Sequence, residues 1–336
     1  MDSNKKIGVI GAGSFGCALA MVLANKGNKV TVWARNAKQV EAMAETRENT
    51  HYLPGVKFPE SIDFTADLEV ASADKDYLVF AVPAQSFRGV FEKASAFFDS
   101  AVPVINVAKG IEKDTLLRLS EVAVNIRPDV RYVALSGPSH AEEVAREMPT
   151  TVVAACYDHD LAVEVQQLFN TERFRVYSNE DLLGVELGGA LKNIIALGAG
   201  ISDGMGFGDN TKAALMTRGI TEITRLGLAL GADMATFSGL AGIGDLIVTC
   251  TSMHSRNRRC GILIGQGMDP EKATEEIGMV VEGISTAEAA FALASKCNIE
   301  MPITECIYKV IHGELNAENA LEFLMKRMTK NEMKIF

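Results

Sequence analysis

A lysine within an apolar helical stretch is the residue best placed to do chemistry in this chain of 336 residues. Between positions 182 and 201 only Glu186 and Lys192 are charged, and glycines and aliphatic residues lie one turn away from Lys192 on both sides. An ammonium on such a face is partly desolvated, which lowers its pKa toward neutrality and suits it to proton transfer. The alternative is a lysine whose head reaches water along an apolar stem. The neighbouring Asn193 could donate to a substrate oxygen or satisfy a backbone group.

A second polar segment is rich in positive charge, although the chain as a whole is acidic. Ser255 is typical of a helix N-cap, and Arg256 would follow it in the first turn, where the helix dipole disfavours a cation unless an anion binds there. Residues 256–259 contain three arginines and no acid. Guanidinium groups match phosphate oxygens, so we predict a phosphate site, with a basic surface patch as the alternative. Asp245, in a glycine-rich turn, either forms that turn or orients Lys192.

Residues 6–16, KIGVIGAGSFG, contain the glycines of a nucleotide-binding turn. Gly11 permits a tight turn, Gly13 lets backbone N–H groups approach a pyrophosphate, and Gly16 lets the helix pack closely on the strand. The motif follows an apolar strand pattern, opens a small-residue helix and precedes a second strand at 29–34, which completes a βαβ unit. We therefore predict dinucleotide binding at a helix N-terminus; a turn that only packs is the alternative.

The residue after the second strand bears on the choice of cofactor. NAD-selective sites place an acidic residue there to bind the adenosine ribose 2′-OH, whereas this strand ends in Arg35. A guanidinium can pair with a 2′-phosphate, so we expect NADP(H) to be accepted and preferred. Otherwise Arg35 is a solvated loop residue beside Asn36, which would cap the next helix.

Composition excludes several classes of protein. The net charge of −10 argues against a nucleic-acid partner. The six cysteines have no C-x-x-C spacing and the five histidines no metal spacing, so we expect reduced thiols in a cytoplasmic protein and no metal site. The uncharged residues 7–24 superficially resemble a signal peptide, but their glycines and the strand that follows favour the nucleotide site. We expect no other stretch long and apolar enough to span a bilayer.

The length suggests two domains, and the hydrophobic periodicity changes near position 181. Strand patterns alternating with helical ones predict an α/β, Rossmann-like, doubly wound and mainly parallel sheet over residues 1–180. Helical periodicity then predicts an all-α domain over residues 181–336. Lys109 follows one of the strands, where it could hold an anionic or carbonyl group of a substrate or be an ordinary solvated lysine. The predicted strands are 62–65, 77–82, 102–107, 131–135, 150–155 and 173–177, and the main predicted helices are 86–97, 116–124, 161–169, 182–201, 211–230, 256–265, 286–296, 304–312 and 318–328.

Several short motifs, in this order, resemble those of bacterial-type NAD(P)-dependent glycerol-3-phosphate dehydrogenase. They are GAGSFG at 11–16, AKGI at 108–111, LSGPS at 135–139, GALKN at 189–193, GIGDL at 242–246 and SRN at 255–257. The resemblance covers nearly the whole chain. It implies reversible reduction of dihydroxyacetone phosphate to sn-glycerol 3-phosphate, a phospholipid precursor, and a C-terminal domain like that of 6-phosphogluconate dehydrogenase.

The resemblance also implies roles for individual residues, with Lys192 as the proton donor in reduction and the acceptor in oxidation. The residues expected around the substrate are Lys109, Gly137, Ser139, Lys192, Asp245, Ser255, Arg256 and Asn257. The residues expected at the cofactor are Gly11, Gly13, Ser14, Phe15, Gly16, Arg35, Lys109, Ala141, Arg256, Val280 and Glu282. Two positions depart from the family, which often has Trp or Tyr at Phe15 and Ser at Ala108; neither touches the expected chemistry.

Two other functions fit part of this pattern. A reductase of the β-hydroxyacid or ketopantoate type also joins a Rossmann domain to helices and uses a lysine, but its carboxylate substrate would not require so many arginines. A non-catalytic NADP(H) sensor would not require a lysine on an apolar helix. The apolar C-terminal helices make a homodimer the expected assembly.

Overall fold

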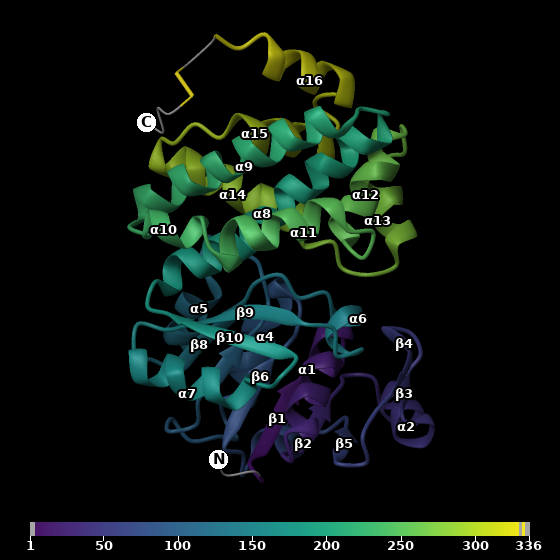
Figure 1. The fold of residues 1–336 in the computed structure, drawn as a ribbon, viewed down its shortest axis with the longest axis vertical. Helices are drawn as coiled ribbons and strands as arrows, with labels where there is room; N and C mark the ends of the chain where they lie inside the picture. The colour runs from purple at the N-terminus through teal and green to yellow at the C-terminus, as the bar shows by residue number, and fades with distance from the viewer. Residues whose placement is uncertain (1–3, 329–330, 333–336) are drawn as a thin grey trace. The chain divides into compact units, whose positions relative to one another are not determined.

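The computed structural model, drawn in Figure 1, describes residues 4–328 and 331–332. Its contacts divide the chain into two units. The first contains residues up to 108 and residues 119–182; the second contains residues 109–118 and those from 183 onward. The sequence placed one boundary at 180/181 and did not anticipate the short segment 109–118, which leaves the first unit and packs with the helices of the second.

The first unit is built on an eight-stranded sheet with the strand order β10-β9-β8-β7-β6-β1-β2-β5. All neighbouring strands are parallel except the antiparallel pair β8 and β9. The expected Rossmann-like, mainly parallel sheet is therefore confirmed. The strands are β1 (Lys6–Ile10), β2 (Lys29–Trp33), β5 (Ile62–Thr65), β6 (Tyr77–Phe80), β7 (Val104–Asn106), β8 (Tyr132–Ser136), β9 (Thr150–Ala155) and β10 (Phe174–Asn179).

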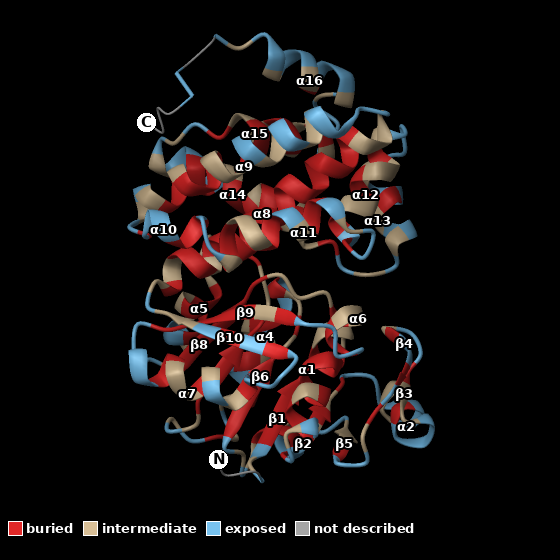
Figure 2. Cartoon of the chain, viewed as in Figure 1, coloured by how far each residue is buried: buried red, intermediate tan, exposed pale blue. Residues whose placement is uncertain are grey.

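The central strands are buried along most of their length, because helices cover the sheet; Figure 2 shows them in red. Asn36, Asp67 and Asp158 each cap a helix through side-chain oxygens that accept first-turn N–H groups. The sequence analysis did not predict the short helices at 68–72 and 141–144. It also did not predict the hairpin of β3 (Glu48–Asn49) and β4 (Leu53–Lys57). The helices of this unit are α1 (Ser14–Asn25), α2 (Ala37–Thr46), α3 (Leu68–Ser72), α4 (Ala84–Ala94), α5 (Leu119–Ile126), α6 (Ala141–Val144) and α7 (His159–Phe169).

The second unit is all-helical among its described residues outside the segment 109–118, which confirms the expected class. Helix α8 (Leu182–Gly204) is its most buried element, and a Cβ added to Gly200 would lie 2.0 Å from the carbonyl oxygen of Arg258 in α12. Glycine therefore allows these two helices to approach. The other elements are α9 (Asp209–Leu230), α10 (Met234–Phe237), the π-helical turn η1 (Leu240–Gly244), α11 (Asp245–Thr251), α12 (Arg256–Gly265), α13 (Pro270–Ile277), α14 (Glu282–Cys297), α15 (Pro302–Ile311) and α16 (Ala317–Met325).

Two stretches of the second unit are long and apolar enough to cross a membrane by length and composition, contrary to our expectation that none would be. One is α8, of which 89% of the apolar window is buried within the protein. The other covers residues 234–251, is 44% buried, and is interrupted by the π-helical turn. Burial among neighbouring helices accounts for the apolar composition of α8, as it does for the core helices of globular proteins.

A buried carboxylate joins two helices of this unit. Glu222 of α9 accepts hydrogen bonds from the backbone N–H groups of Ile303 (2.7 Å) and Thr304 (3.2 Å) at the start of α15. Burial raises the pKa of Glu222 to about 7, against the opposing effect of these hydrogen bonds. The carboxylate thus caps α15, whose N-cap residue Met301 offers no side-chain bond.

Candidate active site

In the first unit, the predicted nucleotide-binding turn has the close approaches that its glycines permit. Gly11 has φ +124°, and a Cβ there would lie 2.6 Å from the carbonyl oxygen of Ala81. A Cβ on Gly16 would lie 2.0 Å from the carbonyl oxygen of Gly11, whereas one on Gly13 would meet nothing within 4 Å. The backbone beside Gly13 therefore borders open space at the N-terminus of α1, which fits an approaching pyrophosphate.

The hairpin that the sequence missed holds this turn in place. Asn49 donates its side-chain Nδ2 to the carbonyl oxygen of Ala12 at 2.9 Å, and Gln39 of α2 donates to the same oxygen at 3.0 Å. Ser14 donates its hydroxyl to the carbonyl of Tyr52 at 2.6 Å. The hydroxyl of Ser14 is thus engaged inside the protein, and its backbone N–H is the group that faces the N-terminal end of α1.

The other expected cofactor residues of this unit lie near strand ends. The backbone N–H of Gly11 donates to the carbonyl of Trp33 at 3.0 Å, so the turn adjoins the end of β2, where Arg35 is exposed. Asn36 caps α2, as expected. Phe15 is half-buried against the core, and Ala141 is the buried first residue of α6.

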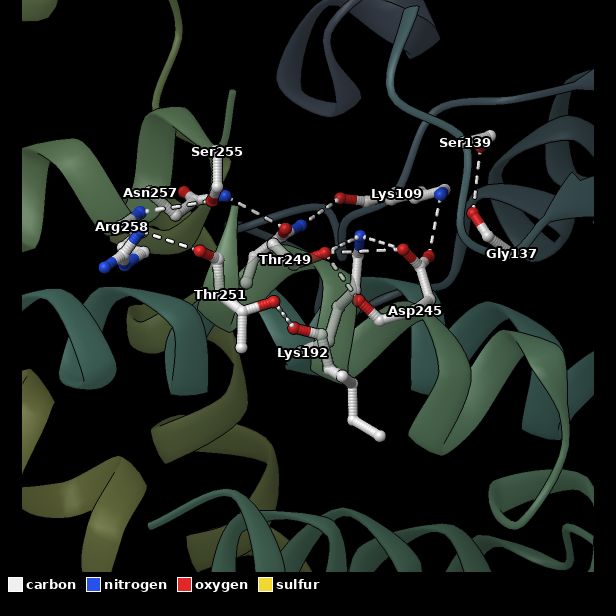
Figure 3. Close-up of polar contacts among 12 residues, drawn as sticks. Lys109, Gly137, Ser139, Lys192, Asp245, Thr249, Thr251, Ser255, Asn257 and Arg258 are labelled. Atoms are coloured by element: carbon white, nitrogen blue, oxygen red, sulfur yellow. Dashed lines mark hydrogen bonds and ion pairs between the residues drawn. The ribbon is translucent and has the colours of Figure 1, made fainter. Parts of the chain in front are cut away.

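Two expected substrate residues follow β8. Gly137 has φ +134°, and a Cβ there would lie 3.0 Å from the Cα of Val152. Ser139 is half-exposed and donates its hydroxyl to the carbonyl of Gly137 at 2.9 Å (Figure 3). The strained backbone at this position requires glycine.

In the second unit, one carboxylate binds two lysines (Figure 3). Asp245, 1% exposed, accepts from the Nζ atom of Lys192 at 2.5 Å through Oδ1 and from that of Lys109 at 2.7 Å through Oδ2. Lys192 also donates to the hydroxyl of Thr249 at 2.7 Å, and that hydroxyl donates to the backbone carbonyl of Asp245. The side chains of Lys192 and Lys109 are 7% and 17% exposed, so neither is an ordinary solvated lysine.

Burial and charge set the proton affinities of this group. The pKa of Lys192 is lowered to about 8, chiefly by burial and also by the positive charge of Lys109, while Asp245 opposes the shift. Burial alone would raise the pKa of Asp245, but the two lysines outweigh burial and hold it below its usual range. An amine with a pKa of about 8 gives up and regains a proton readily near neutral pH, as a general acid and base must.

The segment 109–118 is fixed to α8 at both ends. Asn193 donates Nδ2 to the backbone carbonyl of Lys109 at 3.2 Å, and Arg118 binds Glu186 at 2.7 Å. Glu186, the second charge that the sequence placed on this helix, is therefore the partner of Arg118. These bonds explain how a residue between β7 and α5 comes to lie beside Asp245.

Two arginines of the predicted phosphate site, at the start of α12, have different surroundings. Ser255 is the N-cap, as predicted, and accepts from the backbone N–H of Arg258 at 3.2 Å. Arg256 is exposed in the first turn. Arg258 instead binds Asp203 at 2.8 Å and the carbonyl of Thr251, so its guanidinium is engaged within the protein. The acidic partner lies 55 residues away in the sequence, which no local pattern could reveal.

The remaining expected residues adjoin α12. Val280 is 46% exposed just before α14, and Glu282 is the half-buried first residue of that helix. Asn257 is buried. The sequence did not assign Thr249 a role, although its position four residues after Asp245 places both on one face of α11.

Two family models match most of the chain, and both describe the same family. The N-terminal model of NAD-dependent glycerol-3-phosphate dehydrogenase matches residues 6–162, and the C-terminal model matches residues 181–322. The chain is 51% identical over 332 residues to glycerol-3-phosphate dehydrogenase [NAD(P)+] of Bacillus subtilis, covering 98% of this chain and 96% of the relative. The crystal structure of glycerol-3-phosphate dehydrogenase from Coxiella burnetii has a TM-score of 0.92 at 38% identity and covers 96% of this chain and 99% of that one.

A ketopantoate reductase from Ralstonia eutropha is similar in fold alone. Its TM-score is 0.60 at 13% identity, with 95% of this chain and 99% of that chain covered. Both the lower TM-score and the low identity set it apart from the structure from Coxiella burnetii.

Replacing Asp245 with Asn is expected to destabilise the protein by roughly 3 kcal/mol at about pH 6, because two ammonium groups lose their shared counterion. The destabilisation should be smaller at about pH 9. Without the carboxylate the pKa of Lys192 falls further, the folded state binds fewer protons than the unfolded state, and stability rises with pH. Thermal unfolding at both pH values measures the difference.

Asp114→Asn, which removes an exposed carboxylate from the same unit, is the matched control and should have little effect at either pH. Equal destabilisation of the Asp245 variant at the two pH values would contradict the electrostatic account.

Proposed function

We infer that this chain catalyses the reaction of the family to which it belongs, the NAD-dependent glycerol-3-phosphate dehydrogenases. It is an NAD(P)-dependent oxidoreductase that reversibly converts dihydroxyacetone phosphate to sn-glycerol 3-phosphate, a precursor of phospholipids. The observation that best supports a catalytic chain is the buried amine of Lys192, which shares Asp245 with Lys109. A protein that only binds the cofactor would not require two lysines desolvated around one carboxylate.

In the proposed mechanism Lys192 handles the proton. The nicotinamide cofactor, when bound, supplies a hydride to the carbonyl carbon of dihydroxyacetone phosphate or accepts one in the reverse direction. Lys192 donates an Nζ proton to the carbonyl oxygen, which becomes the hydroxyl of the product, and the neutral amine then regains a proton from solvent. In oxidation the amine takes the hydroxyl proton. Its pKa of about 8 keeps both forms accessible near neutral pH.

Lys109 and Asp245 prepare this step without exchanging the substrate proton. Asp245 orients both ammonium groups through its two oxygens, and Thr249 fixes the Lys192 amine from a second direction. The two positive charges together stabilise negative charge developing on the substrate oxygen, in surroundings where few waters compete.

We place the phosphate of the substrate at the start of α12. Arg256 is an exposed residue of the first turn, where backbone N–H groups and the helix dipole also favour an anion. Binding the phosphate there would fix the carbonyl carbon relative to Lys192. The other residues proposed around the substrate are Lys109, Gly137, Ser139, Asp245, Ser255 and Asn257.

The glycine turn of the first unit fits a dinucleotide, and Arg35 favours NADP(H) among the nicotinamide cofactors by its charge and exposure. Both NAD(H) and NADP(H) belong to the function of the family. The residues proposed to hold the cofactor are Gly11, Gly13, Ser14, Phe15, Gly16, Arg35, Lys109, Ala141, Arg256, Val280 and Glu282.

We further propose that the protein works in the cytoplasm as a homodimer. All six cysteines are free thiols, and five of them are buried, as in proteins of reducing compartments. Terminal helix α16 carries exposed apolar side chains at Phe323 and Met325, which a second copy could cover.

Replacing Lys192 with Ala is expected to lower turnover by roughly 10²–10⁴-fold, because the proton donor is lost. Binding of NADPH should remain, since the glycine turn belongs to the other unit. Turnover is followed by the absorbance of NADPH with dihydroxyacetone phosphate, and binding by NADPH fluorescence. Lys272→Ala, at an exposed lysine of α13, is the control and should retain full turnover. Near-normal turnover of the Lys192 variant would refute the assignment.

Replacing Arg256 with Ala is expected to raise the KM for dihydroxyacetone phosphate by about 10–100-fold, the value of a charged hydrogen bond to the phosphate. Steady-state kinetics with unphosphorylated dihydroxyacetone provide the control, because that substrate has no phosphate for Arg256 to bind. A KM for dihydroxyacetone phosphate that does not change would exclude this role.

A further inference from the structure

We infer that Asn193 and Asn257 form a buried amide relay that positions the substrate-binding segments of the helical unit, and that the side chain of Asn257 acts through this relay and not as a ligand of the phosphate. The inference rests on the proposed function and refines one of its residues. Asn193 and Asn257 are therefore positioning residues.

The relay consists of three consecutive hydrogen bonds. The backbone N–H of Gly283 donates to Oδ1 of Asn257 at 2.8 Å. Nδ2 of Asn257 donates to Oδ1 of Asn193 at 2.9 Å, and Nδ2 of Asn193 donates to the carbonyl of Lys109 at 3.2 Å. Figure 3 shows the Asn257 end close to Ser255 and the Lys109 end close to Asp245.

The two ends of the relay dictate the orientation of both side-chain amides. A backbone N–H can only donate and a backbone carbonyl can only accept, so Asn257 must turn its oxygen toward Gly283 and Asn193 must turn its nitrogen toward Lys109. The central bond then has a nitrogen facing an oxygen. Reversing either amide would set two donors or two acceptors against each other, so one arrangement satisfies every bond.

Burial makes this arrangement costly to break. Asn193 is 5% exposed and Asn257 is 8% exposed, and a buried polar group without a partner costs far more than an exposed one. The relay also leaves no room for a side chain at Gly283. A Cβ there would lie 2.7 Å from the carbonyl oxygen of Asn193 and 2.9 Å from Oδ1 of Asn257.

The relay joins four separate segments of the sequence, each of which carries a residue proposed for binding or catalysis. Asn193 follows Lys192 on α8 and reaches the segment of Lys109. Asn257 follows Arg256 on α12 and reaches the start of α14 beside Glu282. The three bonds therefore hold the segment of Lys109 against α8 and α12, which keeps the two amines in place beside Asp245. Oδ1 and one N–H of the Asn257 side chain are engaged inside the protein, and the residue is 8% exposed, so we assign this side chain to the relay and leave the phosphate to the exposed Arg256.

The test compares Asn257→Ala and Asn193→Ala on two substrates, dihydroxyacetone phosphate and unphosphorylated dihydroxyacetone, with NADPH. If the relay positions the amines, each variant loses kcat/KM for both substrates by a similar factor, on the order of 100-fold, as for an ångström-scale misplacement. A loss confined to dihydroxyacetone phosphate in Asn257→Ala would show direct phosphate binding and overturn the inference. So would unchanged kinetics with both substrates.

The pH profile separates positioning from a general loss of folded enzyme. Releasing the carbonyl of Lys109 moves its ammonium away from Asp245, which removes a positive charge near Lys192 and strengthens the pull of the carboxylate. The alkaline limit of activity should therefore move to higher pH in Asn193→Ala. An equal loss of activity with an unmoved alkaline limit would indicate a merely structural role and count against the relay.

Two further variants complete the design. Gly283→Ala perturbs the relay without removing either amide. If an asparagine variant does not fold, kcat/KM of Gly283→Ala is compared on the same two substrates. Asn319→Ala, at an exposed position of α16, should match the wild type. Wild-type reduction of dihydroxyacetone phosphate tests the proposed function separately, because it does not depend on how the variants behave.

Discussion

The chemistry of this protein depends on one carboxylate held between two ammonium groups in the interior of the helical unit. Asp245 could not remain charged there alone, and Lys192 and Lys109 could not be desolvated without it. The balance of these charges leaves Lys192 with a proton affinity far below that of a free lysine. A general acid and base thus arises from burial and charge pairing in a helix bundle.

Several features of the fold stabilise that arrangement. Helix α8 is apolar on nearly every side because it forms the core of its unit, and its burial shields Lys192 from water. The segment 109–118 leaves the sheet, joins the helices through Arg118 and Asn193, and brings the second amine to Asp245. The first unit contributes the glycine turn, which its neighbours hold through the carbonyl of Ala12.

Local patterns in the sequence predicted the features that depend on local physics. The glycines at 11, 13 and 16, the cap at Ser255 and the isolated lysine on an apolar helix each follow from a few neighbouring residues. Long-range pairings could not be read this way. Arg258 looked like part of a phosphate site because its partner Asp203 is distant in sequence, and the asparagine relay joins residues up to 84 positions apart. The family resemblance supplied residue roles that composition and spacing alone left open.

The most direct test of this account is the titration of Lys192 itself. Heteronuclear NMR of the protein labelled at lysine side-chain nitrogen, with Lys192→Arg to assign the signal, measures the pKa of that amine without reference to activity. The account predicts a pKa well below that of a free lysine, at about 8. A midpoint near the ordinary lysine value of about 10.4 would show that the amine is neither desolvated nor tuned by its neighbours, and would contradict the central claim.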